Sequence, residues 1–86
     1  DPSSVVRRYL ASAMQRTPVS QRASVLSALL GHAEDAQDHN LPLLYWYATE
    51  PVVGEFPEIG LRLLQECQIP KVREFITRRL LATPQA

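Results

Sequence analysis

The sequence predicts an all-α fold, a right-handed superhelix of stacked helical hairpins containing about five helices. Apolar residues recur at helical spacing in five segments, and no segment shows the alternation typical of a β-strand. Six of the seven prolines lie at or near the boundaries of these segments. The 86 residues, 45% of them hydrophobic, indicate a single domain over residues 1–86.

The first two helices each follow a capping residue and a proline. The first helix is expected over about residues 2–16, with Asp1 as its N-cap and Pro2 at its first position. The second is expected to begin in the same way at Thr17 and Pro18. The apolar stripe of the first helix predicts its buried face; its members are Val5, Val6, Tyr9, Leu10, Ala13 and Met14.

A polar loop is expected over residues 31–40, followed by a third helix over about residues 41–53 that is capped by Asp38 or Asn40. This third helix is apolar on nearly every side, which predicts that it is the central element of the fold. Pro51 is expected to kink or end it, because proline lacks the N–H of a helical hydrogen bond.

The last two helices are expected over about residues 57–68 and 69–82. Their spacing predicts these inward residues: Ile59, Leu63, Leu64 and Cys67 in the fourth helix, and Val72, Phe75, Ile76 and Leu80 in the fifth. Helix starts then recur with a spacing of roughly 30 to 38 residues, as in two-helix solenoid units. Helical patterning is already present within the first residues, so we expect the chain to be a piece of a longer protein.

Charge is balanced overall but uneven along the chain. Residues 1–22 and 62–86 each carry a net charge of +3, whereas residues 23–61 carry six acidic residues and no lysine or arginine. Two basic ridges that bind an acidic partner are one interpretation; neutralisation between stacked helices is the other. The overall neutrality argues against a nucleic-acid or membrane-surface binder, and no apolar run reaches the roughly 20 residues of a membrane span.

Three consecutive aromatic residues, Tyr45 to Tyr47, point about 100° apart on a helix and cannot all face one core. Such side chains are typical anchors for a protein partner. The alternative is a helix that packs on two sides with its phenol and indole groups at the rim. Together with the basic residues they define a candidate interaction surface: Arg7, Arg8, Tyr45, Trp46, Lys71, Arg73, Arg78 and Arg79.

Neither a metal site nor a catalytic site is expected. Asp35, Asp38, His39 and Glu50 are metal-ligand types, but Glu50 lies about 15 Å along the helix from His39. The acidic residues are better explained as helix caps. Cys67 lies on an apolar stripe, where a thiol is usually inert packing. No cofactor is expected.

Short phrases at helix starts resemble HEAT repeats. The phrases are Asp1-Pro2 with Val6-Arg7, and Pro70 with Val72-Arg73. The resemblance covers the whole chain and implies one closing helix followed by two hairpins. It also implies that the arginine after the valine reaches an acidic residue of the adjacent unit. The middle unit departs from the pattern, because it keeps Pro42 and loses the arginine.

A second resemblance is to the helical region of large bacterial proteins that join a sugar-dehydrogenase-like β-propeller, HEAT-like repeats and a c-type cytochrome module. It is carried by Asp38-His39-Asn40-Leu41-Pro42-Leu43 with Trp46-Tyr47 and Glu50-Pro51, after His32-Ala33-Glu34-Asp35. This resemblance implies a periplasmic or other extracytoplasmic location. The haem-attachment motif Cys-x-x-Cys-His is absent after Cys67, so no electron transfer is assigned to this chain.

The expected function is that of a non-catalytic scaffold for protein–protein or inter-domain contacts, without nucleic acid or membrane partners. The alternatives are a structural or interface part of an exported haem-containing dehydrogenase-like enzyme, and a small ligand or metal site near His39 and Trp46. The first helix is expected to expose an apolar edge, covered by a neighbouring unit or by a second copy in a homodimer.

Overall fold

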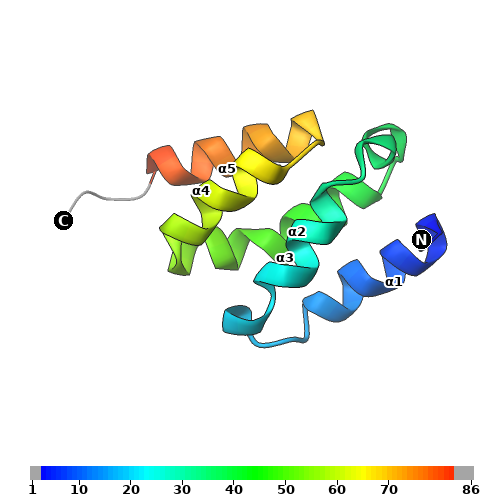
Figure 1. Cartoon of the computed structure of the whole chain (residues 1–86), viewed down its shortest axis with the longest axis horizontal. Helices are drawn as coiled ribbons and strands as arrows, with labels where there is room; N and C mark the ends of the chain where they lie inside the picture. The colour runs from blue at the N-terminus through cyan, green and yellow to red at the C-terminus, as the bar shows by residue number, and fades with distance from the viewer. Residues whose placement is uncertain (1–2, 83–86) are drawn as a thin grey trace.

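The computed structural model describes residues 3–82. Its elements are α1 (Ser4–Met14), the 3₁₀ helix η1 (Val19–Gln21), α2 (Ala23–Leu30), the 3₁₀ helix η2 (Ala33–Gln37), α3 (Leu41–Glu55), α4 (Pro57–Glu66) and α5 (Pro70–Ala82). No strand occurs among the described residues, and the five α-helices form one body (Figure 1). The predicted all-α class is therefore confirmed.

The helix α3 is the central element, as its apolar sequence predicts. It packs against α1 on one side and against α5 on the other, while α2 packs against α4 (Figure 1). Consecutive helices α2 and α3 contact each other, as do α4 and α5. The chain therefore has one layer in the order α1, α3, α5 and a second layer made of α2 and α4.

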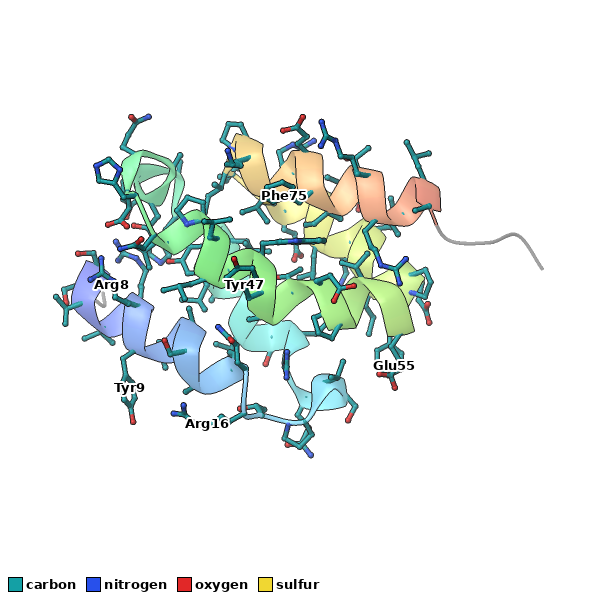
Figure 2. All side chains as sticks on the ribbon, turned by 180° about the vertical axis from the view of Figure 1, so that it is seen from behind. Arg8, Tyr9, Arg16, Tyr47, Glu55 and Phe75 are labelled. Carbon is teal, nitrogen blue, oxygen red and sulfur yellow. The ribbon has the colours of Figure 1, made fainter. Side chains whose placement is uncertain are left out.

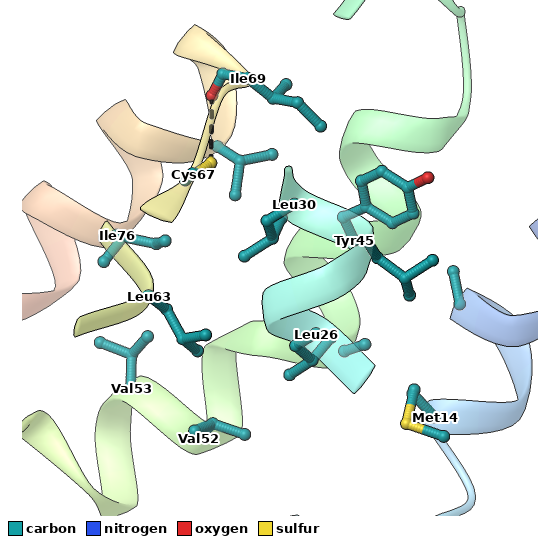
Figure 3. Close-up of a cluster of buried hydrophobic side chains, with 14 of the residues drawn as sticks. Met14, Leu26, Leu30, Tyr45, Val52, Val53, Leu63, Cys67, Ile69 and Ile76 are labelled. Atoms are coloured by element: carbon teal, nitrogen blue, oxygen red, sulfur yellow. Dashed lines mark hydrogen bonds between the residues drawn. The ribbon is translucent and has the colours of Figure 1, made fainter. Parts of the chain in front are cut away.

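The core lies where α2, α3, α4 and α5 meet (Figure 3). Its largest fully buried aliphatic side chains are Leu26, Leu30, Leu41, Val52, Val53, Leu63, Ile69, Val72 and Ile76. At Gly60 the backbone of α4 comes so close to α3 that an added Cβ would lie 3.0 Å from Cγ1 of Val53. The two helices can approach this closely because position 60 has no side chain.

The predicted inner face of α1 is wrong at Val5, Val6 and Tyr9, which are exposed, and is confirmed at Met14, which is buried, and at Leu10, which packs against the core. Arg7 and Ala11 lie outside the predicted face, and both are buried. Ser3 caps this helix, because its Oγ accepts a hydrogen bond from the backbone N–H of Val6 at 3.3 Å. The expected cap Asp1 and the adjoining Pro2 lie outside the described residues.

The second helix begins at Ala23, later than the expected start near Pro18. Residues 19–21 form the short helix η1 instead, and Arg22 follows it. The expected loop over residues 31–40 contains a helical turn as well, η2, whose Asp35 is buried. The carboxylate of Asp38 then accepts hydrogen bonds from the N–H groups of Asn40 and Leu41, at 2.8 and 3.0 Å, at the start of α3.

Pro51 does not end the third helix, because α3 continues to Glu55, beyond the expected end near residue 53, with Pro51 inside it. The alternative expectation, a kink at Pro51, stays a prediction. A proline in a helix interior costs about 3 kcal/mol, mainly through a lost hydrogen bond and a steric clash. The turn after the proline places Val52 and Val53 in the core, where each is at most 1% exposed. Burial of these two side chains offsets that cost.

Candidate interaction surfaces

Arg7, Asp35 and Tyr45 form a buried polar cluster that joins α1, η2 and α3. The Arg7 guanidinium donates from Nε to Oδ2 of Asp35 at 2.7 Å and from Nη2 to Oδ1 at 2.9 Å. The Tyr45 hydroxyl donates to the same Oδ2 at 2.5 Å. The three residues are at most 5% exposed. Arg7 and Tyr45 therefore do not lie on an exposed interaction surface, contrary to the expectation from the sequence.

The cluster holds one ionised pair and a neutral phenol. Burial alone would raise the pKa of Asp35, but the hydrogen bonds from Arg7 and Tyr45 outweigh it and keep that pKa below its usual value. The hydrogen bond to Asp35 raises the pKa of Arg7 against the opposing effect of burial. Burial and the hydrogen bond to Asp35 together raise the pKa of Tyr45. Each of the three side chains has a hydrogen-bond partner within the cluster, so we explain the cluster as a structural contact that holds α1 against η2 and α3.

Arg22 is a second buried arginine, and no pattern in the sequence pointed to it. Its guanidinium donates to the backbone carbonyls of Thr17, Ala48 and Gln15 at 2.8, 2.9 and 3.3 Å. It thereby satisfies carbonyl groups around η1 and in α3 that lie far apart in the sequence. Arg22 lies between η1 and α2, and an isolated arginine in such a segment gives no sequence signal that it is buried.

The remaining candidate cations bind neighbours within the chain. Arg8 lies 3.4 Å from the Asp38 carboxylate, and Arg79 lies 3.1 Å from that of Glu50. Both pairs join a basic outer segment to the acidic middle segment, as the Arg7–Asp35 pair does. These pairs favour the interpretation in which stacked helices neutralise each other.

Two cations of α5 form contacts within the C-terminal half. Arg73 follows Val72, as Arg7 follows Val6, but it donates to the carbonyls of Leu64 and Cys67 at 2.6 and 3.1 Å and not to a carboxylate. Arg78 pairs with Glu74 at 2.9 Å on the exposed side of the same helix.

Three exposed or half-buried aromatic residues and two neighbouring exposed side chains lie on α3 and α5, on a surface that we call the aromatic face. Its members are Leu43, Trp46, Tyr47, Lys71 and Phe75. The rings of Trp46 and Phe75 lie 5.5 Å apart, and the Lys71 ammonium lies 5.9 Å from the centre of the Phe75 ring. Tyr47 is 56% exposed and Leu43 is 39% exposed. Of the three consecutive aromatic residues, Tyr45 is therefore in the core and Trp46 is partly buried against it. Tyr47 faces outward (Figure 2).

A second apolar surface covers the outer side of α1, and we call it the end face. Its members are Val5, Val6, Tyr9 and Arg16. Val5 and Tyr9 are 73% and 69% exposed. Tyr9 and Arg16 project from the side of α1 that is turned away from α3 (Figure 2).

The other candidate sites are an open hollow on α5 and the residues around His39 and Cys67, and within residues 3–82 they form neither an enclosed pocket nor a metal site. A shallow hollow of about 570 Å³ is lined by Pro70, Arg73, Glu74, Thr77 and Arg78, all from α5. Within residues 3–82, no group of three His, Cys, Asp or Glu side chains is placed to hold a metal ion. His39 is exposed in the segment before α3, and burial raises the pKa of the Cys67 thiol. No helix in the described part of the chain is long and apolar enough to cross a membrane.

Comparison with known proteins gives no relative: no protein-family model, no curated protein and no solved structure matches the chain. A functional proposal therefore depends on the chain's own surfaces.

Proposed function

We propose that this chain is a non-catalytic helical scaffold, built on HEAT-like stacked hairpins, that binds other protein segments on its surface. The observation that carries the proposal is the orientation of α1. This helix turns Arg7 into the interior and leaves Val5 and Tyr9 73% and 69% exposed. An apolar stripe exposed beside arginine has the chemistry of a protein interface, because tyrosine and arginine dominate interface anchors.

The packing order supports the HEAT-like form of the proposal. In a stack of hairpins, first helices contact first helices and second helices contact second helices. The contacts of α2 with α4, and of α3 with both α1 and α5, follow that rule. In this arrangement α1 is the end of one layer, so its outer side is the surface on which a further segment would stack.

The aromatic face also supports a scaffold function, because a scaffold needs more than one contact surface. Tyr47 and Leu43 lie one helical turn apart on α3, on a different side of the chain from Tyr9. Both surfaces are built on helices that the core holds, which suits a rigid binding platform.

Photo-crosslinking in the native host tests the proposal. A photoreactive phenylalanine analogue replaces Tyr9, Tyr47 or, as a control, the 51% exposed Leu61 of α4. We expect discrete protein adducts from position 9, with adducts at position 47 if the aromatic face is a second contact surface, and none from position 61. Absence of adducts at both 9 and 47, or equal labelling at all three positions, would contradict the scaffold function.

A thermal-shift series provides the complementary test. A scaffold without a small-molecule site predicts an unchanged melting temperature in the presence of divalent metals, sugars or nucleotides. A rise that saturates with ligand concentration would indicate a binding site in its place. Substitution of His39 and Trp46 would then show whether that site is the one near these residues.

A further inference from the structure

The end face has the geometry of a surface that receives a helix. Val5 and Tyr9 are four residues apart, so they lie one above the other on the same side of α1. Arg16 lies in the turn after α1, two helical turns beyond Tyr9 on the same side (Figure 2). Ser12 and Ala13 stand between them and are small, which leaves room for side chains of a second helix.

The exposed charges that α1 and the turn after it bring to this surface are all positive. No acidic residue occurs from Ser3 through Arg22, and the two exposed cations of that stretch are Arg8 and Arg16. Arg8 has a carboxylate neighbour in Asp38. The guanidinium of Arg16 forms no hydrogen bond or ion pair with any residue between 3 and 82. The surface therefore lacks a carboxylate at its Arg16 end.

This charge pattern argues against a second copy of the chain as the occupant. A symmetric contact between two α1 helices would bring Arg8 and Arg16 of both copies together, without any carboxylate from α1. Like charges placed across an interface oppose association. A partner with carboxylates is electrostatically complementary, and the exposed valine and tyrosine require that it also be apolar.

We propose that the end face binds an acidic amphipathic helix of a partner protein. Apolar side chains at three- or four-residue spacing pack over Val5 and Tyr9, and an aspartate or glutamate of the partner pairs with Arg16. This inference rests on the proposed scaffold function and specifies the partner of one of its surfaces. Recognition of one helix face by another through such anchors is a common mode of peptide binding.

Selection from a displayed library of helical peptides tests the inference and does not require an identified partner. The immobilised chain is the bait, and the selected peptides are measured by fluorescence anisotropy against variants. We expect an enrichment of peptides that combine a leucine or isoleucine stripe with flanking Asp or Glu. Tyr9→Ser should weaken them roughly tenfold or more, since a central tyrosine anchor is worth that much. Arg16→Glu should weaken them about tenfold, and higher salt should weaken wild-type binding.

Two variants of α4 are matched controls. Leu61→Ser and Arg62→Glu change an exposed leucine and an adjacent exposed arginine on a different helix, and both should leave the affinity unchanged. Circular dichroism should show the same helix content in all four variants, because each changed side chain is exposed.

The outcomes separate the inference from the function on which it rests. Peptides that depend on Tyr9 but show no acidic enrichment and no response to Arg16→Glu would overturn the acidic partner and keep the scaffold. A library without any Tyr9-dependent binder would overturn the inference, and the crosslinking at positions 9 and 47 would then decide the scaffold function separately. Sedimentation analysis decides the remaining case: self-association that Tyr9→Ser abolishes and that excludes the peptides would make a second copy the occupant.

Discussion

The two junctions of α3 with its layer neighbours are built from different chemistry. On the α1 side, the buried polar groups are the guanidinium of Arg7 and the hydroxyl of Tyr45, which both donate to the carboxylate of Asp35, and the apolar Ala11 and Met14 of α1 are buried as well. On the α4 and α5 side, the buried groups are aliphatic, with Val53, Leu63 and Ile76 among the fully buried side chains (Figure 3).

The difference determines what each junction tolerates. Aliphatic burial is non-directional and insensitive to charge, so the C-terminal junction depends mainly on volume. A buried polar cluster depends on every partner being present, because the loss of one leaves the others desolvated and unpaired. The attachment of α1, and with it the end face, therefore depends on the protonation state and integrity of this cluster in addition to the burial of Ala11 and Met14.

Removal of the central carboxylate should have the largest effect. Asp35→Ala leaves the Arg7 guanidinium and the Tyr45 hydroxyl buried without their acceptor. Breaking a buried pair in this way costs about 3–5 kcal/mol. We expect the free energy of unfolding, measured by urea titration with circular dichroism, to fall by that amount.

A double variant separates lost charge pairing from lost packing. Arg7→Met with Asp35→Leu, made in a Tyr45→Phe background so that no phenol is left without its acceptor, replaces the buried polar groups by apolar side chains, and such replacements are often neutral or stabilising. It should recover most of the stability that Asp35→Ala loses. If the double variant is as unstable as the single one, an unpaired charge is not the cause of the loss.

A cavity in the aliphatic junction should have the next largest effect. Leu63→Ala removes a fully buried side chain between α3 and α4, which costs about 3 kcal/mol through lost burial and the cavity left behind. Leu61→Ala in the same helix is the control; it should change stability by less than about 0.5 kcal/mol, because Leu61 is 51% exposed. Equal losses in both variants would contradict the assignment of the core.

Acidification should weaken the N-terminal junction selectively. The pKa of Asp35 is lowered in the folded chain, so its contribution to stability is complete above the unfolded value of about 3.9 and is lost as the pH falls through the folded value. The loss should be smaller than that of Asp35→Ala, because a protonated Asp35 retains an acceptor oxygen. Glu34 and Asp38, whose pKa values are also lowered, act in the same direction.

Melting temperatures between pH 2.5 and 7 measure this loss. Asp35→Asn should reduce the slope of the wild-type profile, whereas Leu63→Ala should shift the whole profile downward and leave its slope unchanged.

At alkaline pH the dependence of stability on pH has the opposite sign, because stability falls as the pH rises. The raised pKa of Tyr45 means that its contribution is lost as the pH rises above the ordinary tyrosine value of about 10. Tyr45→Phe should remove that alkaline loss.

The aliphatic junction could be predicted from the sequence because periodicity reports it directly. The spacing of Leu63, Val72 and Ile76 placed these residues inward, and the apolar sequence of α3 identified the central helix. The expected end of this helix, near residue 53, lies before the observed end at Glu55, because a local breaker signal such as Pro51 says nothing of the burial that Val52 and Val53 gain when the helix continues.

The polar junction could not be predicted, because a hydrophobicity pattern counts every arginine as polar, whether it is buried or exposed. Arg7 and Arg8 are adjacent, yet one is buried and the other is exposed. One usable signal was present: Arg7, Ala11 and Met14 share a helical stripe with small or apolar members. Its acceptor Asp35 lies 28 residues away in a segment that reads as a polar loop, and no local rule connects the two. The same error assigned Val5 and Tyr9 to the interior, although these two residues form the exposed apolar edge that was expected of the first helix.

The smallest effect on stability is expected for the ion pair of Glu74 and Arg78, which resembles the Arg7–Asp35 pair but is exposed to solvent. Glu74 and Arg78 lie 2.9 Å apart on the exposed side of α5, with side chains 55% and 72% exposed. An exposed pair of this spacing contributes about 0.3–0.5 kcal/mol, and alanine regains part of that through helix propensity. Glu74→Ala should therefore shift the free energy of unfolding by less than about 0.5 kcal/mol, and 1 M salt should abolish the shift. A loss comparable to that of Asp35→Ala would mean that burial is not what distinguishes the two pairs, and that the attachment of α1 depends on something other than its desolvated cluster.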